Sequence, residues 1–215
     1  MKANRPNQGF TLIEVVLAMT IFSLIMISVI ACWKAVVNGK ITAENAAASA
    51  QRARIGMKTV EEALSCAEVS GQNIPFYAFL NDTSGKFASL SVAARLPAAF
   101  PGSGLFGDNV MRRVSFDVEP GADNQNNLVM NQWPLLEALD QVNTPYPITL
   151  ARDVNIFMLE FWSPQDNDWV VSFDPTNKLP LAIRVTLGVG HSAEHPDVPF
   201  DVIVRTVAPV AVAHQ

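Results

Sequence analysis

Residues 9–33 read GFTLIEVVLAMTIFSLIMISVIACW, and this stretch decides how the chain is organised. Between Val15 and Trp33 no residue is charged. A transmembrane helix needs about 20 consecutive, mostly apolar residues, so the stretch predicts one membrane span. Glu14 lies at the start of this span. Because an acid costs about 2.5–3.5 kcal/mol at the centre of a membrane helix, an acid placed in a span indicates a functional role.

Two simpler interpretations account for only part of this stretch. A secretory signal peptide has an apolar run of about 7–15 residues that ends in an Ala-x-Ala-like cleavage site. Here the run is longer, no such site closes it, and an acid lies inside it. A plain single-pass anchor fits the length, but it does not explain why Gly9 and Phe10 precede Glu14.

The combination of Gly9, Phe10 and Glu14 resembles the N-terminus of type IV pilins and type II secretion pseudopilins. Members of that superfamily have a short basic leader, a Gly at the cleavage point, a Phe that becomes the new N-terminus, and a Glu as the fifth residue of the mature chain. The resemblance covers about the first 30 residues. It implies cleavage by a prepilin peptidase between Gly9 and Phe10, N-methylation of Phe10, and a role for Glu14 in assembly.

A helix is predicted to continue well past the apolar stretch. No proline occurs between Pro6 and Pro75, and proline breaks helix interiors. Residues 40–68 are rich in Ala, Glu, Arg and Lys, which are good helix formers. We therefore expect one helix over about residues 10–68, followed by Gly71 as a C-terminal stop.

The second half of this helix is expected to pack on a folded domain from about Ile55 onward. Met57, Val60, Leu64 and Ala67 recur at helical spacing and share one face. The predicted organisation is a leader (1–9), a transmembrane helix (10–33), its continuation outside the membrane (34–70) and a β-rich globular domain (71–215).

The rest of the chain has the pattern of antiparallel strands. Short β-prone runs are separated by turn-forming residues, and no ten-residue helical pattern lies between them, which argues against βαβ units. The runs cover residues 88–92, 114–118, 154–162, 169–173, 181–189 and 200–207, and residues 96–108 are expected to form a loop. The predicted fold class is α+β, a pilin-like fold with a long N-terminal helix packed on antiparallel sheet.

A second resemblance lies in the C-terminal half. The segment LEFW (residues 159–162), Trp169 and the segment LPLAIRVTL (residues 179–187) are similar to the J-type minor pseudopilins of type II secretion. Phe173 stands where many of those proteins carry a second Trp. This resemblance implies partnership with I- and K-type minor pseudopilins, the major pseudopilin and the inner-membrane secretion platform, besides the prepilin peptidase. A turn-rich hairpin with Trp and Leu-Pro in any small β domain is the alternative interpretation.

Orientation in the membrane follows from the resemblance and not from charge. Lys2 and Arg5 precede the span while Lys34 and Lys40 follow it, so the positive residues are balanced. The superfamily places the leader in the cytoplasm and the C-terminal domain in the periplasm, anchored in the inner membrane by a single pass.

Composition and motifs argue against nucleic-acid binding and catalysis. The net charge of the 215-residue chain is −5, which is opposite to a nucleic-acid footprint, and the closest basic pairs, Arg112-Arg113 and Arg52/Arg54, are expected on solvated faces. No Gly-x-Ser-x-Gly, Walker, His-Glu-x-x-His or Cys-x-x-Cys motif occurs. No cofactor is expected.

Several residues are of types that bind metal ions or form disulfides, but their spacing does not establish such a site. His191 and His195 are four residues apart, but the flanking Gly and Pro disfavour a helix, so two loop histidines are the simpler interpretation. The loop 121–127 offers Asp and Asn oxygens for calcium, although these residues are also common in turns. Cys32 and Cys66 lie too far apart on one helix for a disulfide.

The sequence therefore supports a structural filament subunit, a minor pseudopilin at or near the tip of a type II secretion pseudopilus. A minor pilin of a type IV pilus or a DNA-uptake filament is the alternative. A membrane-tethered enzyme is disfavoured because no reactive set of side chains is recognisable.

Overall fold

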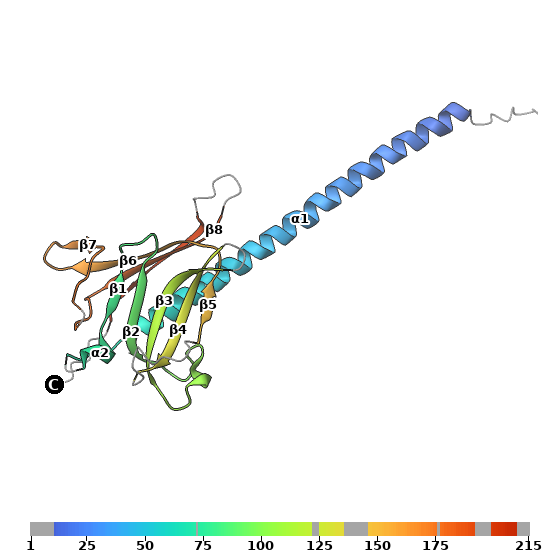
Figure 1. Ribbon diagram of the computed structural model, residues 1–215. Helices are drawn as coiled ribbons and strands as arrows, with labels where there is room; N and C mark the ends of the chain where they lie inside the picture. Colours follow the sequence, from blue (N-terminus) through green and yellow to red (C-terminus); the bar gives the residue numbers. More distant parts are fainter. Residues whose placement is uncertain are drawn as a thin grey trace, which may run out of the picture. The chain divides into compact units, whose positions relative to one another are not determined.

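The computed structural model describes residues 11–71, 73–121, 125–135, 146–175, 177–191 and 199–209 (Figure 1). The chain divides into two compact units, Met1–Ala46 and Ala47–Gln215. Helix α1 (Leu12–Ser65, 54 residues) contributes to both.

In the first unit, α1 is one uninterrupted apolar helix. Its large side chains are exposed, from Leu12 (84%) through Trp33 (70%) to Val37. The helix is long and apolar enough to cross a membrane. Exposed leucine, isoleucine and phenylalanine on every side are expected where lipid or neighbouring apolar helices replace water.

In the second unit, α1 has one buried face. The predicted face is confirmed for Met57, Val60 and Leu64, which are at most 1% exposed. Ala67 is equally buried but lies beyond the end of the helix, where it pairs with Ala94. Burial begins earlier than expected, at Ala53, whereas Ile55 points outward and is 56% exposed. The side chains repeat at three- and four-residue intervals, so a single stripe of the helix contacts the core.

The helix ends at Ser65, slightly earlier than the sequence predicts, because the chain turns to pair with a strand. The Cys66 carbonyl accepts a hydrogen bond from Arg95 N (3.0 Å), and Glu68 N donates to the Ala93 carbonyl (2.8 Å). The Cys66 carbonyl and the Glu68 N–H, which a longer helix would pair within itself, are thus satisfied by the strand.

Two antiparallel sheets form the body of the second unit. The first has the order β1-β2-β3-β4-β5 and the second the order β7-β6-β8-β9. The first comprises β1 (Leu80–Asp82), β2 (Ser89–Arg95), β3 (Met111–Pro120), β4 (Asn126–Pro134) and β5 (Ile148–Ala151). The second comprises β6 (Val154–Ser163), β7 (Asp168–Val170), β8 (Ile183–His191) and β9 (Pro199–Val207). Short helical turns α2 (Ile74–Tyr77) and η1 (Ser103–Leu105) lie in the connections.

The core lies between the helix and both sheets. Val60 and Leu64 of α1 belong to the same buried cluster as Phe116 of β3 and Phe157 of β6. The sheets are also joined directly, since Ala88 N donates to the Phe157 carbonyl at 2.8 Å. Phe79, Phe161 and Phe173 pack edge-on or tilted, with ring centroids 5.4–6.1 Å apart. The α+β class and the packing of the long helix on antiparallel sheet are thus confirmed.

The predicted strands lie where strands are observed, but some observed strands were not predicted. The predicted pairing of residues 154–162 with 169–173 is confirmed by the antiparallel register of Trp162 with Trp169. Strands β1, β4 and β5 were not predicted. Strands β1 and β5 are only three and four residues long. Strand β4 begins with Asn126 and Asn127, which are turn-forming types but pair here with residues of β3.

One prediction was wrong: Arg112 and Arg113 do not lie on a solvated face. They are only 1% and 2% exposed, within β3. Arg112 donates to Gln132 Oε1 (3.0 Å) and Ser103 Oγ (2.7 Å) and stacks on Phe106. Successive strand residues face opposite sides of a sheet, so each arginine is covered by a different set of loops. Burial lowers the pKa of both guanidiniums from its usual value.

Candidate assembly site

The N-terminal end of α1 is held by a contact between Thr11 and Glu14. The backbone N–H and the hydroxyl of Thr11 both donate to Glu14 Oε2, each at 3.0 Å. The bond from the Thr11 N–H to Glu14 is the carboxylate half of a capping box, in which a Glu three residues into the helix satisfies the N–H of the residue before it. Negative charge at this end also interacts favourably with the helix dipole. The sequence order Thr-Leu-Ile-Glu produces this contact locally.

Only one oxygen of the Glu14 carboxylate is occupied in this way. Both bonds go to Oε2, and Oε1 has no hydrogen bond to the described part of the chain. Glu14 can therefore cap its own helix and still accept a bond from a second group. Gly9 and Phe10 lie outside the described residues, so the cleavage and methylation site stays a prediction.

Two hydroxyl side chains of the apolar segment are satisfied within the helix. The Thr20 hydroxyl donates to the Val16 carbonyl and the Ser23 hydroxyl to the Met19 carbonyl, each at 2.8 Å. Hydroxyls that bond to the preceding turn tolerate an apolar environment. Glu14 is thus the one ionisable carboxylate of residues 11–33, and it lies at the end of the segment.

Comparisons with known proteins agree with this geometry. Residues 4–30 match the prokaryotic N-terminal methylation motif. A chain of the GspK-GspI-GspJ complex from the type 2 secretion system of enterotoxigenic Escherichia coli is similar in fold, with a TM-score of 0.51 and 17% identity; the match covers 77% of this chain and 99% of that one. A type IV-like pilin of Thermus thermophilus gives a TM-score of 0.50 and 13% identity, over 76% of this chain and 98% of that one. No curated protein matches in sequence.

The N-terminal motif and the fold are thus both similar to those of type IV pilins and pseudopilins. Helix α1 is long and apolar enough to serve as a single N-terminal membrane anchor.

Several of the other residues that the sequence singled out lie outside the described part of the chain. His191 ends β8, while its side chain and the whole of His195 lie outside the described residues. The same is true of residues 122–124 in the loop considered for calcium. Within the described ranges, no group of three or more His, Cys, Asp or Glu side chains could hold a metal. Cys32 and Cys66 are both free thiols.

Two polar groups with a faint resemblance to catalytic residues have structural roles. Ser103, between two glycines, donates to the Pro97 carbonyl (2.9 Å) and accepts from Arg112. Asp166 accepts from the Ser163 hydroxyl at 2.7 Å, as expected in a turn. Each of these side chains is used in holding a loop.

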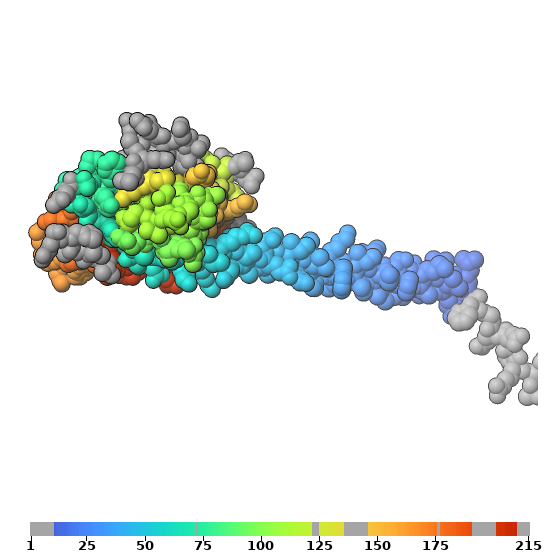
Figure 2. All heavy atoms as spheres, turned by 90° about the horizontal axis from the view of Figure 1, so that it is seen from below, coloured from blue at the N-terminus to red at the C-terminus, as the bar shows by residue number. Residues whose placement is uncertain are grey.

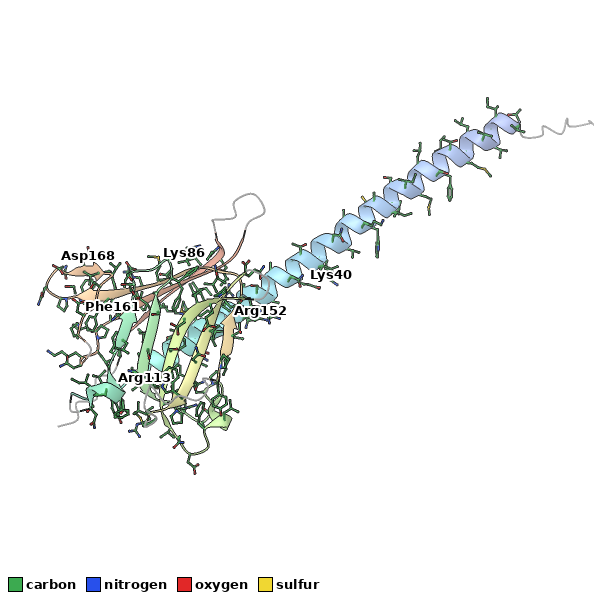
Figure 3. All side chains as sticks on the ribbon, viewed as in Figure 1. Lys40, Lys86, Arg113, Arg152, Phe161 and Asp168 are labelled. Carbon is green, nitrogen blue, oxygen red and sulfur yellow. The ribbon has the colours of Figure 1, made fainter. Side chains whose placement is uncertain are left out.

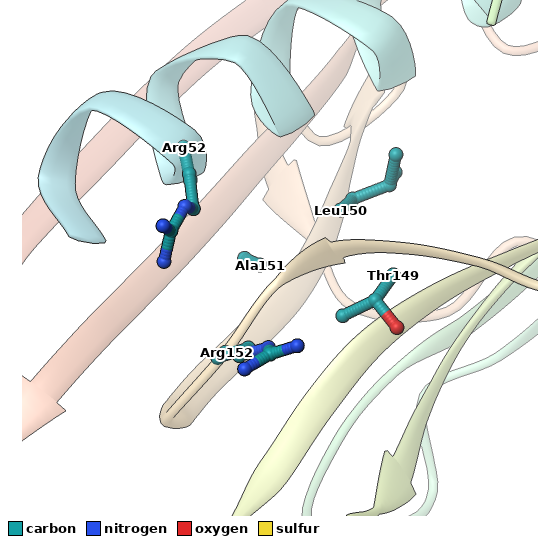
Figure 4. A pocket seen from close by; sticks show the side chains of 5 residues that line it. All are labelled: Arg52, Thr149, Leu150, Ala151 and Arg152. Atoms are coloured by element: carbon teal, nitrogen blue, oxygen red, sulfur yellow. The ribbon is translucent and has the colours of Figure 1, made fainter. Parts of the chain in front are cut away.

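The sequence did not predict a recess between α1 and β5 that carries two arginines (Figure 4). Arg52 and Arg152 are a hundred positions apart in sequence, and only the packing of β5 on α1 brings them to one place. Arg52 was expected on a solvated face, and its side chain is indeed exposed.

Proposed function

We propose that this chain is a minor pseudopilin, a structural subunit at or near the tip of the periplasmic pseudopilus of a type II secretion system, where it supports protein export. The observation that carries the proposal is the correspondence with one chain of the GspK-GspI-GspJ complex over 99% of that chain. The methylation motif, which the fold comparison does not depend on, supports the same assignment.

In this proposal the leader, residues 1–9, is removed and the amine of Phe10 becomes the new N-terminus beside the membrane. That amine and Glu14 carry opposite charges in a region of low dielectric, where charges attract strongly and unpaired charges are costly. Oε1 of Glu14, which the capping contact leaves unused, accepts a bond from the Phe10 amine of a neighbouring subunit. The pairing then sets the axial stagger of adjacent helices.

The proposed location is the inner membrane, with residues 10–33 spanning it, residues 34–70 continuing the helix, and residues 71–215 in the periplasm. The proposed partners are I- and K-type minor pseudopilins, the major pseudopilin, the prepilin peptidase and the inner-membrane secretion platform. Apolar helices exchange contact with lipid for contact with one another when the filament forms.

Affinity purification of the chain from its host under mild detergent tests this proposal. We expect the matching I- and K-type subunits to co-purify at fixed ratios together with platform proteins of type II secretion. Co-purification with pilus retraction proteins in their place would overturn it.

The second candidate function is a minor pilin of a type IV pilus or a DNA-uptake filament. It is favoured by the similarity to the type IV-like pilin of Thermus thermophilus, whose TM-score is nearly equal to that of the secretion protein. Genes for a secretion ATPase and an outer-membrane secretin near the coding sequence would favour secretion. Neighbouring pilus retraction genes would favour the pilus.

A further inference from the structure

A recess of about 300 Å³ lies between α1 and the end of β5. Its walls are formed by Arg52 from the helix and by the segment from Thr149 to Arg152. Figure 4 shows the side chain of Arg52 extending from α1 toward the strand that carries Arg152. Both arginine side chains are exposed.

Close packing of the helix on the strand creates this recess. Gly56 is buried, and a Cβ added to it would lie 3.0 Å from both the Cβ and the carbonyl oxygen of Leu150. Arg52 precedes Gly56 by one helical turn and therefore shares its face. Arg152 follows β5 directly, at the bend where the chain leaves the first sheet for the second. Buried contacts between Gly56 and Leu150 thus fix the backbone segments that carry the two arginines.

Within the described part of the chain, the two arginines lack anionic partners, unlike their neighbours. Arg54 pairs with Asp201 (3.7 Å) and Arg205 with Glu61 (3.8 Å). By contrast, no hydrogen bond or ion pair joins Arg52 or Arg152 to any described residue, and none of the described residues that line the recess is an acid. Two like charges at one site repel, and an anion between them relieves that repulsion. The planar fork of a guanidinium matches a carboxylate in two parallel hydrogen bonds.

We propose that Arg52 and Arg152 form a binding site for a carboxylate of an acidic segment on a neighbouring filament subunit. This inference rests on the proposed function for the nature of the partner. The outer side of α1 in the second unit is uncovered by the sheets (Figure 2). Ile55, 56% exposed on that helix, supplies an apolar contact beside the charged one. The partner therefore carries glutamate or aspartate next to an apolar side chain.

The test uses the full chain in nanodiscs of uncharged lipid, titrated with hexaglutamate at low salt. We expect binding, and a loss of about three- to fivefold in affinity for each of Arg52→Gln and Arg152→Gln, as for a solvent-exposed ion pair. Lys178→Gln removes the same charge from an exposed position outside the recess and should leave the affinity unchanged. An equal loss in all three variants indicates attraction by net charge alone and overturns the site.

A second arm separates protein carboxylates from lipid. Vesicles containing phosphatidylglycerol replace hexaglutamate in the same titration. If they bind with the same dependence on both arginines and hexaglutamate does not, the site takes a membrane surface and the proposal is wrong. This measurement does not depend on which filament the chain joins. The purification described above can therefore fail while the site stands, and the site can fail while the assignment to secretion stands.

Discussion

Glu14 contacts Thr11 at the start of α1, and in the proposed function it also pairs with a neighbouring subunit. Single substitutions can separate these two roles. Glu14→Ala removes both the contact to Thr11 and the negative charge, whereas Glu14→Gln keeps an oxygen for the Thr11 N–H but carries no charge. We expect both variants to insert into the membrane normally, because removing an acid from a span is favourable, and both to lose assembly. Membrane fractionation and a secretion assay measure the two outcomes.

The glutamine variant decides which role matters. Secretion by Glu14→Gln at the normal level would show that capping alone is sufficient and that charge pairing with a neighbour is not needed. Secretion by Glu14→Ala would contradict any role in assembly.

Processing between Gly9 and Phe10 is the next residue-scale prediction. In a host with an active prepilin peptidase, the intact mass should fall by the Met1–Gly9 peptide and rise by one methyl group. Residues 4–30 carry the methylation motif on which this expectation rests. Mass spectrometry of the purified chain is the measurement, and a host without the peptidase is the control. Retention of Met1 in the active host would refute it.

Arg113 is a buried residue whose main partner is a backbone carbonyl. Figure 3 labels Arg113 among the side chains of the second unit. Its Nη1 and Nη2 donate to the Ala78 carbonyl at 3.1 and 2.7 Å. Arg113→Ala should lower the free energy of unfolding by about 3 kcal/mol, since it leaves that carbonyl without its donors and opens a cavity. Arg113→Met fills the space and removes a buried charge, so its cost should be smaller.

Denaturant unfolding followed by tryptophan fluorescence measures this difference. Arg152→Ala is the matched control, because an exposed arginine should change stability by no more than about 0.5 kcal/mol. Equal stability of the Arg113→Ala variant and the unaltered chain would show that the buried contact is energetically neutral.

At the scale of elements, α1 meets two environments along its length. Gly56 lies in the packed half, where a methyl group would press on Leu150 at 3.0 Å. Gly56→Ala should therefore separate α1 from β5 and cost about 1–3 kcal/mol in unfolding free energy, as overpacking does. The same substitution would disturb the recess between Arg52 and Arg152.

Gly39→Ala is the control within the same helix. Nothing lies within 4 Å of the added Cβ, and alanine is a better helix former than glycine by about 1 kcal/mol. No loss of stability is expected from this variant in the same unfolding measurement. If Gly56→Ala is equally harmless, the contact of α1 with β5 is looser than the structure indicates.

At the scale of the whole molecule, the chain consists of an anchor unit and a unit that contains both sheets. The buried cluster belongs to the second unit, so a truncated chain that begins at Asn38 should fold in solution. We expect it to be monomeric alone and to form a stoichiometric complex with the matching I- and K-type domains. Size-exclusion chromatography of the mixture is the measurement. Self-assembly of the truncated chain, or binding to pilus subunits only, would favour the pilus.

The sequence alone determined those features that depend on neighbouring residues. Continuous apolarity from Val15 to Trp33 predicts a span, and the spacing of Met57, Val60 and Leu64 predicts the buried face. The contact of Thr11 with Glu14 is equally local, but it was recognised only in the structure. Each of these follows from helical periodicity or from contacts within one turn, which do not require knowledge of the fold. The strong β-prone runs in the C-terminal half were found for the same reason.

The tertiary structure alone decided the contacts between elements. Burial of Arg112 and Arg113 depends on loops that cover β3, and short strands such as β5 exist because a neighbour supplies their hydrogen bonds. The recess of Arg52 and Arg152 depends on contact between residues nearly a hundred positions apart, Gly56 and Leu150. Burial and pairing of this kind are set by distant partners, and no local pattern of residue types encodes which partners will meet.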